Sequence, residues 1–178
     1  MQAFATDEPD VASNKAPTCI LLDKDKKCIA FGKTARARIL QADLEAEILS
    51  YFEGFKMVLQ SYRSGPEPMV PSTMGHPIRV PVRLLLQMTF ERCKEQALEK
   101  ANGCSMEPIA EVTWVITVPA EWSDKARDLV GKAAADAGLE DKQFAMKILV
   151  VAEPEAACQM VCVCVCVCVC VLCAHTRT

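Results

Sequence analysis

The hydrophobic residues change their spacing several times along the chain, and each spacing predicts a different element. Two short apolar runs, Cys19–Leu22 and Cys28–Phe31, flank the polar residues 23–27. This arrangement predicts a β-hairpin with a polar turn. Over residues 39–62 the apolar positions recur every three or four residues, which predicts an amphipathic helix. Gly54 weakens the second half of that helix, and a break into a turn or strand is the alternative there.

The ends of the next segments are marked by proline, glycine and asparagine. Residues 63–81 hold five of the ten prolines and are predicted to form a loop. The spacing of apolar residues over 82–101 predicts one long helix, and Asn102-Gly103 is a typical C-terminal stop. Residues 1–17 are mostly polar and are predicted to form a flexible N-terminus.

A strand, a helix and a second strand follow in order. Residues 112–118 are a β-rich run, and Ser123 is a candidate N-cap for a helix that ends at Gly138. Residues 148–152 form a second continuous apolar run. This order predicts a right-handed βαβ unit with parallel strands. Because neither strand alternates with polar residues, we expect helices on both faces of their sheet.

The C-terminal tail, residues 161–178, has an unusual composition. Valine and cysteine alternate strictly over residues 161–171. The codons GTG and TGT make this pattern from a repeated GT dinucleotide, so we interpret the tail as a translated repeat outside the folded domain. Three alternatives are a membrane helix, a thiolate metal site and a buried strand. A membrane helix needs about 20 apolar residues, more than this stretch provides. The sulfurs on one face of a strand do not converge on a metal ion. A strand that is apolar on both faces has no fixed register.

Composition and charge exclude several classes of partner. The chain of 178 residues has 23 acidic and 20 basic residues and a net charge of −3. These values argue against a nucleic-acid binder or a protein of acidic membrane surfaces. Two histidines argue against a His-rich metal site. Outside the tail the cysteines are scattered with no C-x-x-C pair, and the N-terminal residues show no secretory signal, so we expect a cytoplasmic protein.

One acidic residue stands where ligands commonly bind. Glu153 comes directly after the apolar run 148–152, and Pro154 and Glu155 follow it. Open α/β sheets bind ligands at the carboxyl ends of their strands, where a carboxylate can take a proton from water or hold a hydrated Mg²⁺. The alternative is an ordinary helix start, which favours proline and acidic residues. The seven glycines are too far apart for a G-x-G or Walker A phosphate loop.

Several motifs, in this order, resemble the nucleotide-binding domain of the heat-shock-protein-70 family. They are Trp-Val-Ile-Thr-Val-Pro-Ala-Glu-Trp at 114–122, Ala-Gly-Leu at 137–139 and Ala-Glu-Pro-Glu-Ala-Ala at 152–157. Tyr-Phe-Glu-Gly-Phe-Lys-Met at 51–57 is similar to the divergent 12A/12B branch. The resemblance covers residues 18–160 and implies an α/β fold. That fold is part of an actin-like ATPase (ribonuclease H-like) domain, whose mixed sheet contains the hairpin and the βαβ unit.

The resemblance also implies ligands and residue roles. ATP and Mg²⁺ would lie in a cleft between two lobes. Glu153 corresponds to the family carboxylate that helps to position the attacking water and the hydrated Mg²⁺. Lys56 corresponds to the family's phosphate-facing lysine, with a surface lysine on an amphipathic helix as the alternative.

Two family motifs have no counterpart in this sequence. An Asp-x-Gly-Thr loop is expected before residue 18, and an Asp-x-Gly-Gly-Gly-Thr loop is expected after the helix that follows Glu153. Because phosphoryl transfer depends on positioning and electrostatic stabilisation, we expect a heat-shock-70-like domain that does not hydrolyse ATP. Strands that would pair with residues 19–31 are also expected to be missing. The alternative is a non-enzymatic remnant, or a module that binds a protein partner through an exposed sheet edge.

Overall fold

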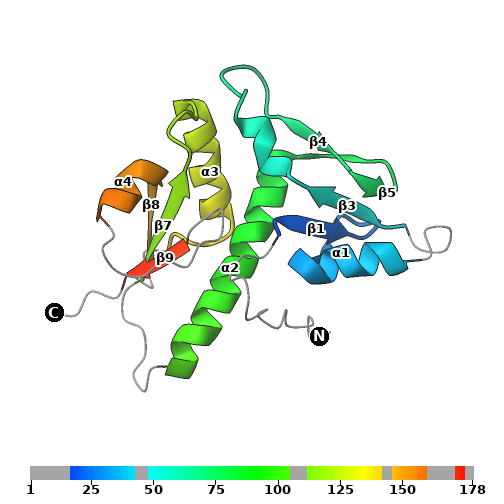
Figure 1. The fold of residues 1–178 in the computed structure, drawn as a ribbon, viewed down its shortest axis with the longest axis horizontal. Helices are drawn as coiled ribbons and strands as arrows, with labels where there is room; N and C mark the ends of the chain where they lie inside the picture. The colour runs from blue at the N-terminus through cyan, green and yellow to red at the C-terminus, as the bar shows by residue number, and fades with distance from the viewer. Residues whose placement is uncertain (1–16, 43–47, 105–111, 142–145, 160–170, 175–178) are drawn as a thin grey trace.

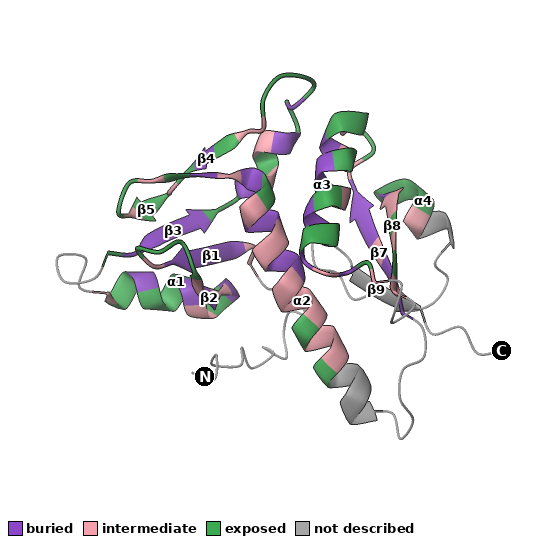
Figure 2. Ribbon diagram, turned by 180° about the vertical axis from the view of Figure 1, so that it is seen from behind, coloured by how far each residue is buried: buried purple, intermediate pink, exposed green. Residues whose placement is uncertain are grey.

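The computed structural model has a mixed α/β fold with several sheets. It describes residues 17–42, 48–104, 112–141, 146–159 and 171–174. The long helix α2 (Val82–Cys104) runs between a four-stranded sheet on one side and a three-stranded sheet on the other (Figure 1). Buried residues concentrate on the strands of both sheets and on the helix faces turned toward them (Figure 2).

The four-stranded sheet is antiparallel and confirms the predicted hairpin. Its order is β2 (Cys28–Phe31), β1 (Cys19–Leu22), β3 (Ser50–Glu53) and β5 (Met74–Gly75). The Asp23 carboxylate closes the turn by accepting backbone N–H bonds from Asp25 and Lys27, each at 2.9 Å. β1 lies between β2 and β3, while the outer edge of β2 has no partner strand among the described residues, so the absence of the opening strands stays a prediction.

The single helix predicted over residues 39–62 is wrong, and the alternative of a turn or strand around Gly54 is confirmed. The chain instead forms α1 (Gly32–Gln41), the strand β3 and the short 3-10 helix η1 (Phe55–Leu59). Strand β3 is buried on both faces, because Tyr51 and Phe52 belong to different apolar clusters. A strand with two apolar faces shows no polar alternation, which is why the sequence resembles a helix here. Two positions expected on the buried helix face, Leu40 and Ile48, are 68% and 52% exposed.

The proline-rich loop predicted at 63–81 contains three short strands. β4 (Met69–Pro71) and β6 (Arg79–Pro81) pair as an antiparallel two-stranded sheet, and β5 joins β3. Proline lacks an N–H donor and is tolerated on edge strands. Both strands of a two-stranded sheet are edges, so Pro71 and Pro81 fit at the ends of these strands.

Helix α2 confirms the long helix predicted from residue 82. It continues through the expected stop at Asn102-Gly103 to Cys104. Its buried residues Val82, Leu86 and Phe90 join the larger apolar cluster. The same cluster contains the inner residues of β7 and α3, so α2 is the element that joins the two halves of the structure.

The predicted βαβ unit is confirmed. β7 (Val112–Val118) and β8 (Met146–Ala152) pair in parallel, and α3 (Asp124–Asp136) connects them. The Ser123 hydroxyl caps α3 by accepting the Ala126 N–H at 3.1 Å. Gly138, at φ +70°, takes the left-handed conformation that commonly follows a helix.

One face of this parallel sheet is fully covered and the other only in part, so the expected cover of both faces is met in full on one. Helix α3 packs against one face, where Trp114 and Ile116 are fully buried. On the other face Lys147 is exposed and Leu149 is 49% exposed. Helix α4 (Glu153–Gln159) contacts both β7 and β8 but leaves these two residues accessible.

A short piece of the C-terminal tail joins the same sheet. β9 (Val171–Ala174) pairs antiparallel with residues 113–116 of β7, which differs from the expectation of a tail outside the fold. The rest of 161–178 lies outside the described residues, as do residues 1–16 of the predicted flexible N-terminus. The interpretation of the tail as a translated repeat stays a prediction.

Candidate functional site

Glu153 stands at the carboxyl end of the parallel strand pair. It is the first residue of α4 and follows Ala152, which pairs with Val118 at the end of β7. The side chain of Glu153 is exposed, while Ala152 beside it is buried. Glu155 folds back, and its Oε2 accepts the Ala152 N–H at 3.4 Å. The strand pair therefore presents a solvated carboxylate at the edge where open α/β sheets bind ligands.

Lys56 comes from the other half of the structure. It is half-buried in η1, between the buried residues Phe55 and Leu59. Gly54 precedes η1 at φ +64°, which turns the chain sharply after β3. The helix η1 packs against α2. Lys56 is therefore on a short structured turn and not on the amphipathic helix that the apolar spacing predicts.

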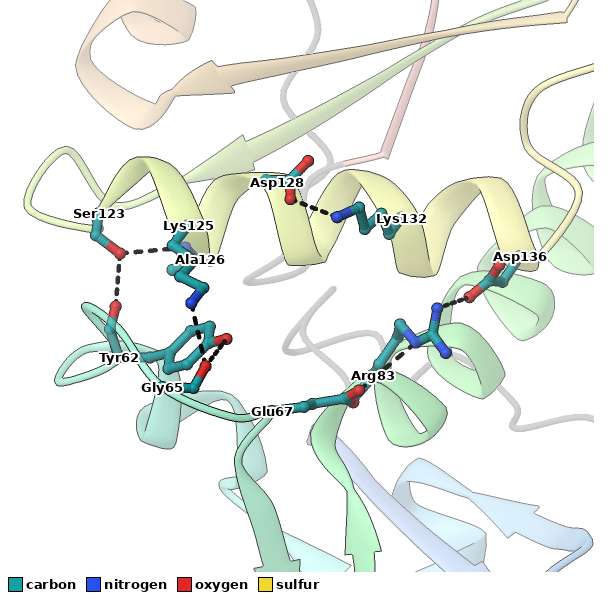
Figure 3. A network of polar contacts seen from close by, with 10 residues as sticks. All are labelled: Tyr62, Gly65, Glu67, Arg83, Ser123, Lys125, Ala126, Asp128, Lys132 and Asp136. Carbon is teal, nitrogen blue, oxygen red and sulfur yellow. Dashed lines mark hydrogen bonds and ion pairs between the residues drawn. The ribbon is translucent and has the colours of Figure 1, made fainter.

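The segment after η1 is attached to the start of α3 by three polar contacts. The Ser123 hydroxyl donates a hydrogen bond to the Tyr62 carbonyl while it caps α3. The Lys125 ammonium donates to the Gly65 carbonyl at 3.1 Å and lies 5.5 Å from the centre of the Tyr62 ring. Figure 3 shows these side chains converging from the two halves. They fix the position of η1 relative to the loop that follows β7.

A second group of polar contacts joins the two halves near the other end of α3. Arg83, at the start of α2, forms an ion pair with Asp136 at 3.1 Å and a longer one with Glu67 at 3.8 Å (Figure 3). The backbone N–H of Arg83 also donates to the Glu67 carboxylate at 3.0 Å. All three side chains are partly exposed, so this group contributes orientation more than stability.

The structure places both predicted residues at surfaces but does not bring them together. Helix α4, which begins with Glu153, and η1, which carries Lys56, stand apart in Figure 1, with α3 drawn between them. Among the described residues no group of three or more histidine, cysteine or acidic side chains is arranged to hold a metal ion. What the site presents on its own is one carboxylate at the sheet edge and one ammonium on a separate turn.

Cysteine chemistry is not part of this site. Cys28 lines a cavity of about 350 Å³ between β2 and α2, away from Glu153. Burial raises the pKa of Cys28 to about 11, and it does the same for Cys93. Because the thiolate is the nucleophilic form, this shift lowers the reactivity of both thiols near neutral pH.

The junction that positions η1 has no local signal in the sequence. Ser123 is predicted as an N-cap, but its second bond, to Tyr62, joins residues 61 positions apart. Nothing in the local pattern predicts such a distant partner. Lys125 and Arg83 are likewise ordinary surface cations in the sequence. A lone serine before a helix therefore predicts the cap. Its hydrogen bond to the Tyr62 carbonyl is seen only in the folded structure.

Comparison with known proteins assigns the family. No family model matches the chain. Heat shock 70 kDa protein 12A of Mus musculus is 33% identical over 162 residues, which is 88% of this chain. The Homo sapiens 12A protein gives the same values, and Homo sapiens heat shock 70 kDa protein 12B is 33% identical over 165 residues, again 88% of this chain. The chain is a 12A/12B-like domain of the heat-shock-70 family.

The family assignment concerns a part of these relatives. The chain spans 24% of the length of the two 12A proteins and 23% of the 12B protein. The heat-shock-70 assignment confirms the family that the motifs at 114–122 and 152–157 resemble. None of the helices in the described part of this domain has the length and apolar character that a membrane span requires.

Proposed function

We propose that residues 18–160 form part of an actin-like nucleotide-binding domain, the ATP-binding part of a heat-shock-70-family chaperone. The observation that carries this proposal is the position of Glu153. It follows the second of two parallel strands, directly beside the end of the first. The 12A/12B-like family assignment supports the same interpretation, because the motif around Glu153 is one of those that resemble this family.

Glu153 is the residue we assign to the catalytic water and to Mg²⁺. An exposed carboxylate can accept a proton from water, and it can hold Mg²⁺ through the water molecules that this ion retains. Bound Mg-ATP would supply the phosphoryl group that is transferred to water. Glu153 fits that use, because it is exposed and is not joined to a cation by any of the described ion pairs.

Lys56 is the residue we assign to the phosphate side of the cleft. A lysine ammonium attracts phosphate as a point charge. The turn at Gly54 sets the start of η1, and the Tyr62–Ser123 hydrogen bond ties the end of this segment to α3. We therefore expect this junction to fix the position of the Lys56 ammonium relative to α3.

The residues present do not provide a cradle for the phosphates. Such a cradle is built from closely spaced glycines, whose backbone N–H groups approach the phosphate oxygens. The shortest spacing between two glycines of this chain is that of Gly131 and Gly138. Because phosphoryl transfer depends on positioning, we propose that this chain does not hydrolyse ATP.

Calorimetric titration tests whether the chain, without a phosphate cradle, binds the nucleotide. Mg-ATP added to the 178-residue chain under reducing conditions is expected to give no binding in the micromolar range, since one carboxylate and one ammonium do not enclose a triphosphate. The variants Glu153→Gln and Lys56→Ala are the matched controls and should give the same trace. A micromolar dissociation constant for the unmodified chain that either variant weakens would contradict the expected absence of binding and identify a competent site.

Location and partners follow from composition and family. No disulfide joins the cysteines of the described residues, among them Cys28 and Cys93, and this supports a reducing, cytoplasmic compartment. The net charge of −3 supports the absence of a nucleic-acid partner. Protein partners are proposed on the basis of the family alone.

A non-enzymatic, partner-binding module is the second candidate function. One specific observation favours it, which is the open outer edge of β8 among the described residues. Exposed edge strands are templates for the addition of another strand.

A further inference from the structure

The cavity between β2 and α2 is enclosed by three parts of the fold. One wall is β2 with the end of the hairpin turn, the second is the start of α1, and the third is one face of α2. Its volume of about 350 Å³ falls within the range of about 300–1,000 Å³ that is usual for small-molecule sites. Because Cys28, Phe31 and Met88 line the cavity and also pack against the larger apolar cluster, the core holds its walls in place.

Part of the lining is apolar. Phe31, Met88 and Cys28 carry an aromatic ring, a thioether and a thiol, and all three side chains are partly buried. Sulfur atoms make favourable contacts with aromatic rings. Burial raises the pKa of Cys28 to about 11, so the thiol is neutral at pH 7 and adds no negative charge. This part of the cavity therefore fits an apolar and preferably aromatic group.

The side of the cavity next to the hairpin turn is basic. Lys26 and Lys27 line it and are exposed, whereas Asp23 of the same turn does not line it and accepts two backbone N–H bonds within the turn. The start of α1 reaches the cavity at Thr34. Its N-cap residue is Phe31 and its first turn has no acidic residue, so neither offsets the partial positive charge of this helix end. The two lysines are the main attraction for an anion here.

The α2 side of the cavity carries charges of both signs. The Arg92 guanidinium, with 17% of its side chain exposed, pairs with Glu95 at 3.3 Å. Gln87 donates to the Glu91 carboxylate at 2.9 Å. Both carboxylates thus have a partner within α2. Three cationic and two anionic side chains line the cavity, a net charge of +1, and they are Lys26, Lys27, Arg92, Glu91 and Glu95.

We infer that this cavity binds a small organic anion with an apolar body, the class that includes aromatic carboxylates. The apolar body lies against Phe31 and Met88, and the anionic group lies on the exposed side near Lys26 and Lys27. Lysine acts on an oxyanion as a point charge, so the cavity selects for charge and apolar area. The inference is independent of nucleotide binding and of the partner-binding candidate, because Glu153, Lys56 and β8 do not line this cavity.

Nuclear magnetic resonance titration of the isotope-labelled full chain, in reducing buffer, tests the inference. The probes are naphthoate and naphthamide, which have the same aromatic body and nearly the same shape, but only naphthoate is charged. We expect naphthoate to bind at one saturable site with a dissociation constant of about 0.1–1 mM. The shifted amides should be those of Cys28–Phe31, Thr34 and the facing part of α2. Naphthamide should bind about fivefold or more weakly.

Two double variants with the same change in net charge test the basic side. Lys26→Gln with Lys27→Gln should weaken naphthoate about fivefold or more and leave naphthamide unchanged. The matched control is Lys24→Gln with Lys132→Gln, which replaces two exposed lysines that do not line the cavity and should bind naphthoate as the unmodified chain does. Because all four lysines are exposed, we expect both double variants to keep the spectrum of the folded chain outside the substituted sites.

Four outcomes would overturn the inference. Shifts that do not saturate, or shifts centred away from β2 and α2, would show that the cavity is not a binding site. Equal affinity for naphthoate and naphthamide would show that it does not select anions. Equal weakening of naphthoate binding by the two double variants would show that Lys26 and Lys27 act only through the net charge of the chain.

Discussion

Replacing Trp114 with alanine is expected to lower the free energy of unfolding by about 3–5 kcal/mol, as removal of a large aromatic side chain from a core does. Trp114 is fully buried in β7 and belongs to the cluster that also contains residues of α2 and α3. Its removal leaves a cavity where the two halves of the structure meet. Urea denaturation followed by circular dichroism measures the loss.

Two further variants separate cavity formation from other effects. Trp114→Phe keeps most of the volume and removes an indole N–H that has no hydrogen-bond partner among the described residues, so its loss should be clearly smaller. Trp122→Ala is the matched control, because Trp122 is only half-buried, and we expect about 1–2 kcal/mol there. Equal losses for Trp114→Ala and Trp122→Ala would show that Trp114 does not occupy the shared core.

Replacing Gly75 with alanine is expected to cost about 2–5 kcal/mol through backbone strain and overpacking together. Gly75 pairs with Ser50 in the sheet and has φ +77°, which L-residues rarely adopt. A Cβ added there would overlap the backbone oxygen of Leu49. That oxygen also accepts the His76 N–H at 2.6 Å, so the strand end cannot move away without losing a hydrogen bond.

Gly65 supplies the control for strain without overlap. It has φ +92°, but a Cβ added there meets nothing within 4 Å. Gly65→Ala should therefore cost about 1–2 kcal/mol, the strain alone. The same denaturation series compares the two variants, and a loss for Gly75→Ala no larger than that for Gly65→Ala would contradict the close approach of β5 to Leu49.

The elements that could be predicted from the sequence are those with a local cause. The hairpin at residues 19–31, the cap at Ser123 and the two apolar runs around α3 each carry their signal within a few residues. Parallel pairing of β7 with β8 follows, because a strand, helix and strand in order close in one hand. Glu153 could be placed at the sheet edge for the same reason.

The elements that could not be predicted depend on distant partners. Strand β3 is buried by β1 and β5 on its edges and by two apolar clusters on its faces, so its own residues read as part of a helix. The exposed sheet face at Lys147 and Leu149 could not be predicted, because an apolar run does not indicate which elements cover it. The same apolar spacing predicts a helix around Lys56, and the hydrogen bond that attaches this segment to α3 joins Tyr62 to Ser123, 61 positions away.

Nuclear Overhauser spectroscopy on the isotope-labelled chain tests the central claim most directly, because it reports which backbone protons of β7 and β8 are neighbours. The account predicts contacts between Trp114 and Ile148 and also between Val118 and Ala152, the parallel register that places Glu153 beside the end of β7. Contacts that run in the opposite order, with the end of β7 beside the start of β8, would contradict it.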